Sequence, residues 1–166
     1  ILGYTYSTAI EKVHIDFCRR ICGLHQSVAN FFPVSECGRT PVYVHYTSKC
    51  VKYWIKILQM PSDRYPRQCY AMLFRLSEVG RDTWATYVKE ILYEYGFGYA
   101  WISQDIGNTD NFMCLLMERL KTRSTQTMFN QIEHSPKAEH YRHFKTTLDT
   151  ERYLSINLPY NLKIQL

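Results

Sequence analysis

Three lysines recur at intervals of three and four residues, at Lys49, Lys52 and Lys56. In an α-helix, residues with this spacing share one face, so their ammonium groups can contact successive phosphates of a nucleic acid. Tyr46 and Tyr53 lie close to them in the sequence and offer rings on which bases can stack. The pattern predicts a nucleic-acid-binding face, and the competing interpretation is an ordinary solvated helix face.

Two arginines of the first predicted helix extend this prediction. The chain carries a net charge of +5, and residues 1–60 hold seven Lys/Arg against three Asp/Glu, so most of the excess lies there. A mildly basic chain permits a polyanionic partner without requiring one. The predicted nucleic-acid-binding residues are therefore Arg19, Arg20, Tyr46, Lys49, Lys52, Tyr53 and Lys56.

The residues that most resemble a catalytic or metal site are histidines near the C-terminal end. His140 and His143 are three apart, with Glu139 and His134 nearby, but no His-Glu-x-x-His motif or Cys-x2-Cys pair accompanies them. A Cys–His nucleophile pair is formally possible, although no protease signature surrounds any cysteine. We expect no catalytic residues, no metal and no cofactor in this chain, and a His/Glu metalloenzyme is the weaker alternative.

The six cysteines point to a reducing compartment. Their number is even, but the chain is not short and shows no signal peptide, so we expect free thiols and an intracellular location, in the nucleus or the cytoplasm. No apolar run approaches the roughly 18 residues of a membrane span, and no membrane partner is expected. The first residue is Ile, which suggests a fragment of a larger multidomain protein.

Hydrophobic residues recur mainly with the period of an α-helix. Capping residues, glycines and prolines separate the periodic stretches, and no stretch is convincing as a strand. The fold class predicted is all-α, a compact multi-helix bundle or array of about seven helices, forming a single domain over residues 1–166. The expected helices are 8–22, 28–32, 41–60, 66–79, one capped by Asp82 and ended by Gly96 and Gly98, 110–133, 136–148 and 150–156, with one more from Pro159. Residues 101–108 are expected to form a loop. In the first helix, Ile10, Val13, Phe17 and Ile21 follow the helical period, and Cys18 and Cys22 are expected to form a partly buried face.

Several segments, taken in order, resemble one region of a known protein family. Their order and spacing are similar to the region just downstream of the polymerase in animal LINE-type (non-LTR) retrotransposon proteins, and the resemblance covers nearly the whole chain. The segments are residues 11–20 (EKVHIDFCRR), 36–41 (ECGRTP), 51–58 (VKYWIKIL), 95–98 (YGFG) with Trp101, and 140–145 (HYRHFK).

The resemblance implies a parent protein that is an RNA-directed DNA polymerase. This chain lacks the Tyr/Phe-x-Asp-Asp motif of the polymerase palm, the endonuclease domain and a Cys/His knuckle, so no polymerase activity transfers to its residues. What the resemblance implies is a non-catalytic helical segment that supports the polymerase, contacts RNA or an RNA–DNA duplex, and packs on other domains of the parent. The alternatives are a structural protein-interaction scaffold with no nucleic-acid contact, and a decayed copy of such an element.

Overall fold

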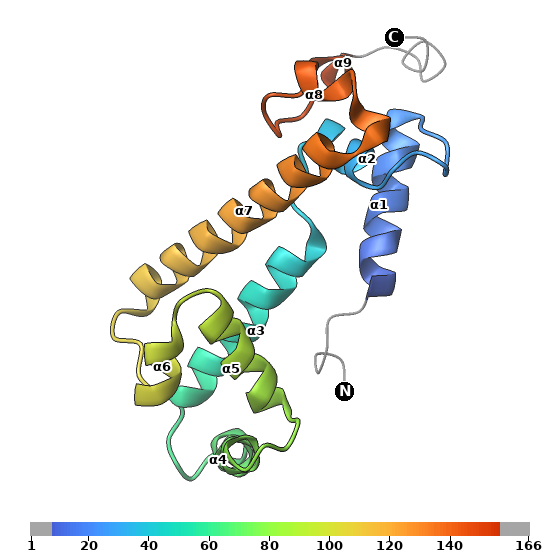
Figure 1. Cartoon of the computed structure of the whole chain (residues 1–166). Helices are drawn as coiled ribbons and strands as arrows, with labels where there is room; N and C mark the ends of the chain where they lie inside the picture. The colour runs from blue at the N-terminus through green and yellow to red at the C-terminus, as the bar shows by residue number, and fades with distance from the viewer. Residues whose placement is uncertain (1–7, 157–166) are drawn as a thin grey trace. The chain divides into compact units, whose positions relative to one another are not determined.

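The chain is all-α, as the sequence predicts. A computed structural model describes residues 8–156 (Figure 1). Within that range there is no β-strand, and extended pairing is limited to one antiparallel bridge between Cys37 and Thr150. The helices are α1 (Thr8–Cys22), α2 (Phe31–Glu36), α3 (Val42–Leu58), α4 (Tyr65–Glu78), α5 (Trp84–Glu94), α6 (Gly98–Ser103), α7 (Thr109–His134), the 3-10 helix η1 (Pro136–Ala138), α8 (Tyr141–Phe144) and α9 (Arg152–Ser155).

The described residues form two compact units. The first unit comprises residues 43–120, and the second comprises residues 8–42 and 121–156. Helix α7 supplies its first residues to the first unit and the remainder to the second. The second unit is thus assembled from two stretches of chain that are distant in the sequence.

The core of the first unit is built around α3. Val51, Trp54 and Ile55 of α3 are buried, and they pack with buried residues of α5, α6 and α7. The indole of Trp54 donates a hydrogen bond to the hydroxyl of Tyr70 (2.8 Å), which donates to Oε1 of Gln104 (2.6 Å). Because each of these polar groups has a partner, this chain of bonds fixes α4 and the end of α6 against α3.

Helix α5 begins at a well-formed N-cap. Thr83 has extended backbone angles, and its hydroxyl accepts a hydrogen bond from the backbone amide of Thr86. The amide of Thr83 donates the reciprocal bond to the hydroxyl of Thr86, which completes a capping box. The sequence pattern suggests Asp82 as the cap, which is wrong by one residue. The hydroxyl of Thr83 also donates to the carbonyl oxygen of Leu73 (3.3 Å), which ties α5 to α4.

The second unit closes through hydrogen bonds between its two stretches of chain. The hydroxyl of Thr150 donates to the carbonyl of Cys37 (3.0 Å), and the amide of Glu151 donates to the carbonyl of Glu36 (2.9 Å). Gly38 lies in this contact with a positive φ of 58°. Apolar packing completes the unit through two clusters: Phe31, Val34, Met128, Ile132 and Ala138, and Cys18, Cys22 and Cys37.

Three short elements differ from the sequence prediction. The helix predicted at 28–32 is observed as α2, which begins at Phe31, includes Pro33 and ends at Glu36. Gly98 begins α6 instead of ending the preceding helix, so part of the stretch 101–108, predicted as a loop, is helical. The predicted helix 136–148 is replaced by η1 and the four-residue α8. Elements of three to six residues contain too few periodic positions for the sequence to predict their bounds. The helix expected from Pro159 lies outside the described residues.

The predicted apolar face of the first helix is not its buried face. The helical period of Ile10, Val13, Phe17 and Ile21 predicts that they face the core, yet all four are exposed, and Val13 is 70% exposed. Helix α1 packs through Cys18 and Cys22, near Leu24 and Leu154, which confirms the face predicted for these two cysteines. Thiols are small apolar groups that allow close helix contact, so they take the place of the larger side chains.

Candidate nucleic-acid interface

Helix α3 has one buried side and one basic side. Its sequence contains no Asp or Glu, so every formal charge on it is positive. Val44, Thr47, Val51 and Trp54 are among the residues of the buried side, and they hold the helix rigidly in the first unit. The remaining surface of α3 is therefore a preformed, cationic face.

The three lysines of α3, hereafter the lysine face, all lie on the exposed side. Each residue of an α-helix turns by about 100° and rises by about 1.5 Å, so Lys49 and Lys56 are nearly aligned and about 10 Å apart along the axis. Lys52 lies between them, offset by about 60° toward the same side. Duplex DNA carries one charge per about 1.7 Å of axis, so a face of this length meets several phosphates.

The lysine face is not neutralised by the rest of the described chain. No carboxylate among residues 8–156 forms an ion pair with Lys49, Lys52 or Lys56. Lys89 offers a contrast, because its ammonium group pairs with Glu78 at 3.2 Å. Within the described residues, the three side chains of the lysine face are therefore exposed and have no ion-pair partner.

The two predicted tyrosines differ in their surroundings. Tyr53 is 51% exposed beside the lysine face, and its ring contacts Trp84 at 5.8 Å in an edge geometry. Tyr46 is half-buried against Tyr87, with ring centroids 6.2 Å apart, and burial raises the pKa of its hydroxyl. Tyr53 is thus placed to stack on a base, whereas Tyr46 serves mainly the packing of α3 on α5.

The two arginines predicted to bind nucleic acid lie on α1, in the second unit. The guanidinium of Arg19 donates to Asp16 (2.9 Å), to the carbonyl of Val28 (2.9 Å) and to the side chain of Asn30 (2.5 Å). Because these bonds engage the guanidinium in holding the loop after α1, we do not include Arg19 among the proposed phosphate contacts. Arg20 is exposed and stays a prediction.

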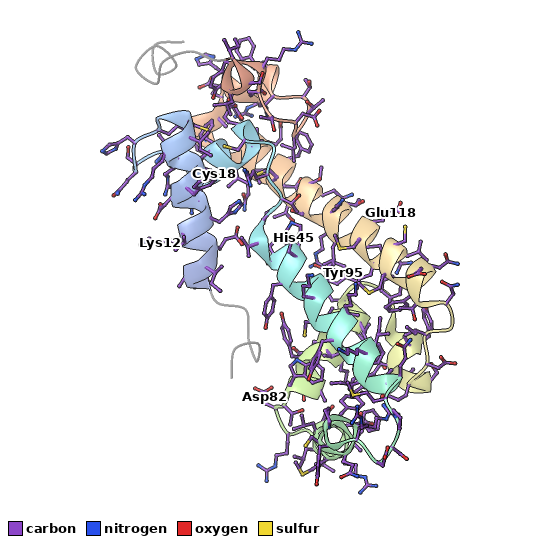
Figure 2. All side chains as sticks on the ribbon, turned by 180° about the vertical axis from the view of Figure 1, so that it is seen from behind. Lys12, Cys18, His45, Asp82, Tyr95 and Glu118 are labelled. Carbon is purple, nitrogen blue, oxygen red and sulfur yellow. The ribbon has the colours of Figure 1, made fainter. Side chains whose placement is uncertain are left out.

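One residue of this surface is missing from the predicted set. His45, labelled on α3 in Figure 2, is exposed and lies one helical turn before Lys49. The spacing 45, 49, 52, 56 is apparent in the sequence, yet a histidine is mostly neutral at pH 7 and adds little to a pattern of permanent charges. Its imidazole adds a hydrogen-bonding group to the same side of α3.

The histidines at the C-terminal end do not form a metal site in the structure. His134, His140 and His143 are all exposed, and Nδ1 of His134 is 2.8 Å from the carbonyl of Asn130. Among residues 8–156, no group of three or more His, Cys, Asp or Glu side chains is arranged to hold a metal ion. The His/Glu cluster therefore supports no proposal of metal-dependent catalysis.

A Cys–His contact does occur, between Sγ of Cys18 and Nε2 of His14 at 3.7 Å. Cys18 is fully buried, and burial together with the nearby Cys37 thiol raises its pKa to about 12. A nucleophilic cysteine needs an accessible thiolate with a lowered pKa. Cys18 has the opposite properties and belongs to the core.

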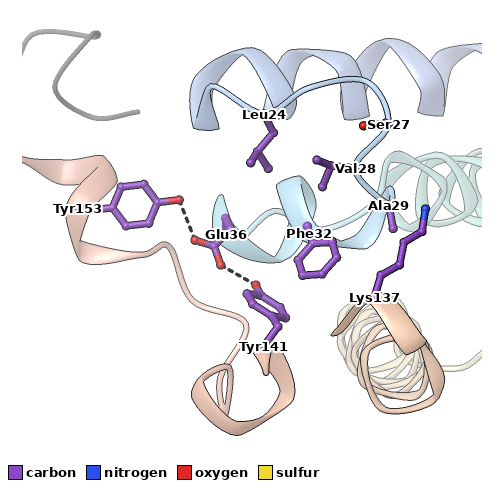
Figure 3. Close-up of a pocket in the computed structure, with 9 residues that line it drawn as sticks. All are labelled: Leu24, Ser27, Val28, Ala29, Phe32, Glu36, Lys137, Tyr141 and Tyr153. Atoms are coloured by element: carbon purple, nitrogen blue, oxygen red, sulfur yellow. Dashed lines mark hydrogen bonds between the residues drawn. The ribbon is translucent and has the colours of Figure 1, made fainter. Parts of the chain in front are cut away.

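A pocket of about 600 Å³ lies in the second unit (Figure 3). The carboxylate of Glu36 borders it and accepts hydrogen bonds from the hydroxyls of Tyr141 (2.5 Å) and Tyr153 (2.7 Å). Burial and these bonds to Glu36 raise the pKa of both hydroxyls. Leu24, Val28 and Phe32 make much of the lining apolar. With its carboxylate already satisfied, Glu36 acts as a structural link between α2 and the C-terminal segment.

Comparison with known proteins identifies no family for this chain. No protein-family model, curated protein or solved structure matches the chain. No helix within residues 8–156 combines the length and the apolar character needed to cross a membrane. The surface of α3 therefore has to be interpreted from its own chemistry.

Proposed function

We propose that this chain is a non-catalytic helical segment of a non-LTR retrotransposon reverse transcriptase protein, and that its α3 binds the backbone of RNA or of an RNA–DNA duplex. The observation that supports binding is the lysine face: three exposed ammonium groups on a rigid helix that carries no carboxylate. The family half of the proposal rests on the ordered sequence segments that resemble the region downstream of the polymerase.

Each residue has a defined part in the proposed contact. Lys49, Lys52 and Lys56 neutralise successive phosphates, which releases counterions and favours binding without regard to sequence. Tyr53 stacks on an adjacent base where the strand is single. The proposed role within the parent protein is to hold nucleic acid beside the polymerase and to pack on neighbouring domains, inside the cell, in the nucleus or cytoplasm.

The test is a binding measurement with a charge-neutral variant of the lysine face. The triple substitution Lys49→Gln, Lys52→Gln and Lys56→Gln keeps helix propensity and removes three positive charges. Fluorescence anisotropy at fixed ionic strength, with labelled single-stranded RNA and a labelled RNA–DNA duplex, should show binding at least about tenfold weaker. Three contacts worth only about 0.5 kcal/mol each already reach that factor.

A matched control separates specific contacts from net charge. The variant Lys12→Gln, Lys121→Gln and Lys137→Gln loses the same charge from exposed positions outside α3. The affinity of this control variant for RNA should be nearly that of the unsubstituted chain. Salt screens the attraction between phosphates and lysines that do not contact them. Equal weakening by both triple variants would sink the proposal, and so would wild-type affinity in the α3 variant.

A second candidate function, a protein-interaction scaffold without nucleic-acid contact, is favoured by exposed apolar residues. On α1, Ile10, Val13, Phe17 and Ile21 are exposed at helical spacing. Contiguous exposed apolar surface is typical of protein interaction sites. If the scaffold were the whole function, the triple lysine variant would leave RNA affinity unchanged.

A further inference from the structure

Helix α4 displays a regular apolar row that nothing in the described residues covers. Its members are separated by four, three, four and three positions, and the exposed fractions of Tyr65, Met72 and Val79 are 82%, 58% and 74%. The lysine face plays no part in it, because that face belongs to α3. This row, hereafter the apolar seam, consists of Tyr65, Cys69, Met72 and Leu76 of α4 and of Val79, the residue that caps its C-terminal end.

The opposite side of α4 fixes the seam toward solvent. Tyr70 is buried and bonded to Trp54 and Gln104, and the ring of Phe74 lies 5.2 Å from that of Trp101. Turning the seam inward would break these contacts and expose Tyr70. The outward orientation is therefore part of the fold of the first unit.

The spacing of the seam indicates which structure fits on it. A 4-3-4-3 repeat averages 3.5 residues, which is the period at which two α-helices interlock along a common line. The occupant that matches the seam is therefore another amphipathic helix.

The charges beside the seam indicate the chemistry of that helix. Arg64 and Arg75 lie on the same side of the row, are exposed, and form no ion pair with a carboxylate of residues 8–156. The nearest acidic residue of the helix, Glu78, already pairs with Lys89 at 3.2 Å. Glutamates or aspartates beside the apolar row of a partner helix would pair with both arginines, whereas a parallel second copy of α4 would bring like charges together.

We propose that the apolar seam of α4 is a docking site for an amphipathic helix with acidic flanks, supplied by another polypeptide. Leu- or Ile-type side chains of the partner fill the gaps between Tyr65, Met72 and Val79. Its acidic residues pair with Arg64 and Arg75. The proposal is independent of nucleic-acid binding by α3.

The test uses the full 166-residue chain and two labelled synthetic helical peptides. Both peptides carry Leu at heptad positions a and d; one has Glu and the other Lys at positions e and g. Anisotropy titrations should show that the Glu peptide binds at least about tenfold more tightly, and that Arg64→Glu with Arg75→Glu reverses the preference. No binding of the Glu peptide, or equal binding of both peptides, would overturn the proposal.

Variants of the seam provide the second arm of the test. Met72→Ser with Val79→Ser should reduce binding of the Glu peptide at least about tenfold. Ile102→Ser is the matched control, since Ile102 is 75% exposed in the same unit and lies outside the seam, and it should bind normally. Helix content from circular dichroism verifies that each variant folds.

Two other outcomes would assign the seam to a different occupant and overturn the proposal. One such outcome is a dimer of the unsubstituted chain, detected by analytical ultracentrifugation, that Met72→Ser with Val79→Ser abolishes. That result would identify a second copy as the occupant. Loss of RNA binding in the same variant would assign the seam to nucleic acid.

Discussion

At the scale of single residues, burial decides which side chains retain their chemistry. Cys18 and Arg19 are neighbours in the sequence, and both belong to types that are often functional. In the structure the thiol of Cys18 is buried beside Cys37, and Arg19 is engaged with Asp16 and Asn30. The lysines of α3 stay available to anions because no carboxylate within residues 8–156 pairs with them.

The raised pKa of Cys18 makes stability depend on alkaline pH. The thiol ionises near 9.0 when unfolded but only near 12 when folded, so the folded state holds its proton more tightly. Its contribution to stability is complete below pH 9 and is lost as pH rises from 9 toward 12. We expect the free energy of unfolding to fall over this window by up to about 1.4 kcal/mol per pH unit from this group.

Urea unfolding of the reduced chain at several pH values between about 7 and 10.5 measures this dependence. Cys18→Ser removes the titrating thiol. The free energy of unfolding of this variant should therefore fall less steeply between about pH 9 and 10, before the tyrosines ionise. Cys22, Tyr141 and Tyr153 also have raised pKa values and keep part of the slope in both proteins. Identical slopes for the two proteins would contradict the assignment to Cys18.

Whether a side chain stays exposed could be predicted from the sequence for some of these residues and not for others. The lysine face was predictable because its spacing is local and lysines are rarely buried. The hydrogen bonds of the Arg19 guanidinium were not predictable from the sequence. Its partners Val28 and Asn30 lie in a loop whose path depends on the whole second unit. The exposed face of α1 was not predictable either, since periodicity identifies an apolar face but not what covers it.

At the scale of elements, stability depends on how helices begin and how they are tied together. Thr83 combines both tasks, because its hydroxyl accepts the amide hydrogen of Thr86 at the start of α5 and approaches the carbonyl of Leu73 in α4. Helix α4 carries the apolar seam and α5 packs beside it. The cap thus helps to present that seam.

Replacing Thr83 with Ala should lower the free energy of unfolding by about 1 kcal/mol, within a range of about 0.5–2 kcal/mol for N-cap substitutions. Thr83→Ser keeps the capping oxygen and should lose much less. Urea denaturation of the two variants beside the parent measures both effects. An Ala variant as stable as the Ser variant would show that the cap contributes little.

The long helices were predictable from sequence and the short ones were not. Helices α3, α4 and α7 have long periodic stretches, and their observed ends differ from the predicted ones by only a few residues. Helices α6 and α8 have six and four residues, too few for a periodic pattern to be distinctive. Their conformation follows from tertiary contacts such as the packing of Trp101 in the core.

At the scale of the whole molecule, the chain folds into two compact units, and the second unit requires a long-range closure. Its two stretches meet where Cys37 pairs with Thr150, and Gly38 lies in that contact. A Cβ atom at Gly38 would lie 2.3 Å from the backbone nitrogen of Thr150, far inside contact distance. The closure therefore depends on the absence of a side chain at this position.

Gly38→Ala should be strongly destabilising, by about 3 kcal/mol or more, because it adds a backbone clash to the cost of a positive φ. Gly80→Ala is the matched control: Gly80 also has a positive φ, of 77°, but a Cβ there would meet nothing within 4 Å. The control should lose only about 1–2 kcal/mol. Thermal unfolding compares the two, and equal losses would contradict a close contact at Gly38.

The proposed binding of nucleic acid also has a component that belongs to the molecule as a whole, since a net charge of +5 attracts any polyanion. Contacts made by the lysine face must be distinguished from this general attraction. Counterion release makes the distinction, because only neutralised phosphates contribute to the dependence of affinity on salt. Each contact to a single strand adds about 0.7 to the slope of log K against log salt concentration.

The decisive measurement is therefore this slope for single-stranded RNA, in the parent chain and in the variant Lys49→Gln, Lys52→Gln and Lys56→Gln. If all three lysines contact phosphates, the slope of the variant should be shallower by about 2. An unchanged slope would contradict a nucleic-acid-binding role for α3. So would an affinity of the unsubstituted chain for RNA that does not respond to salt.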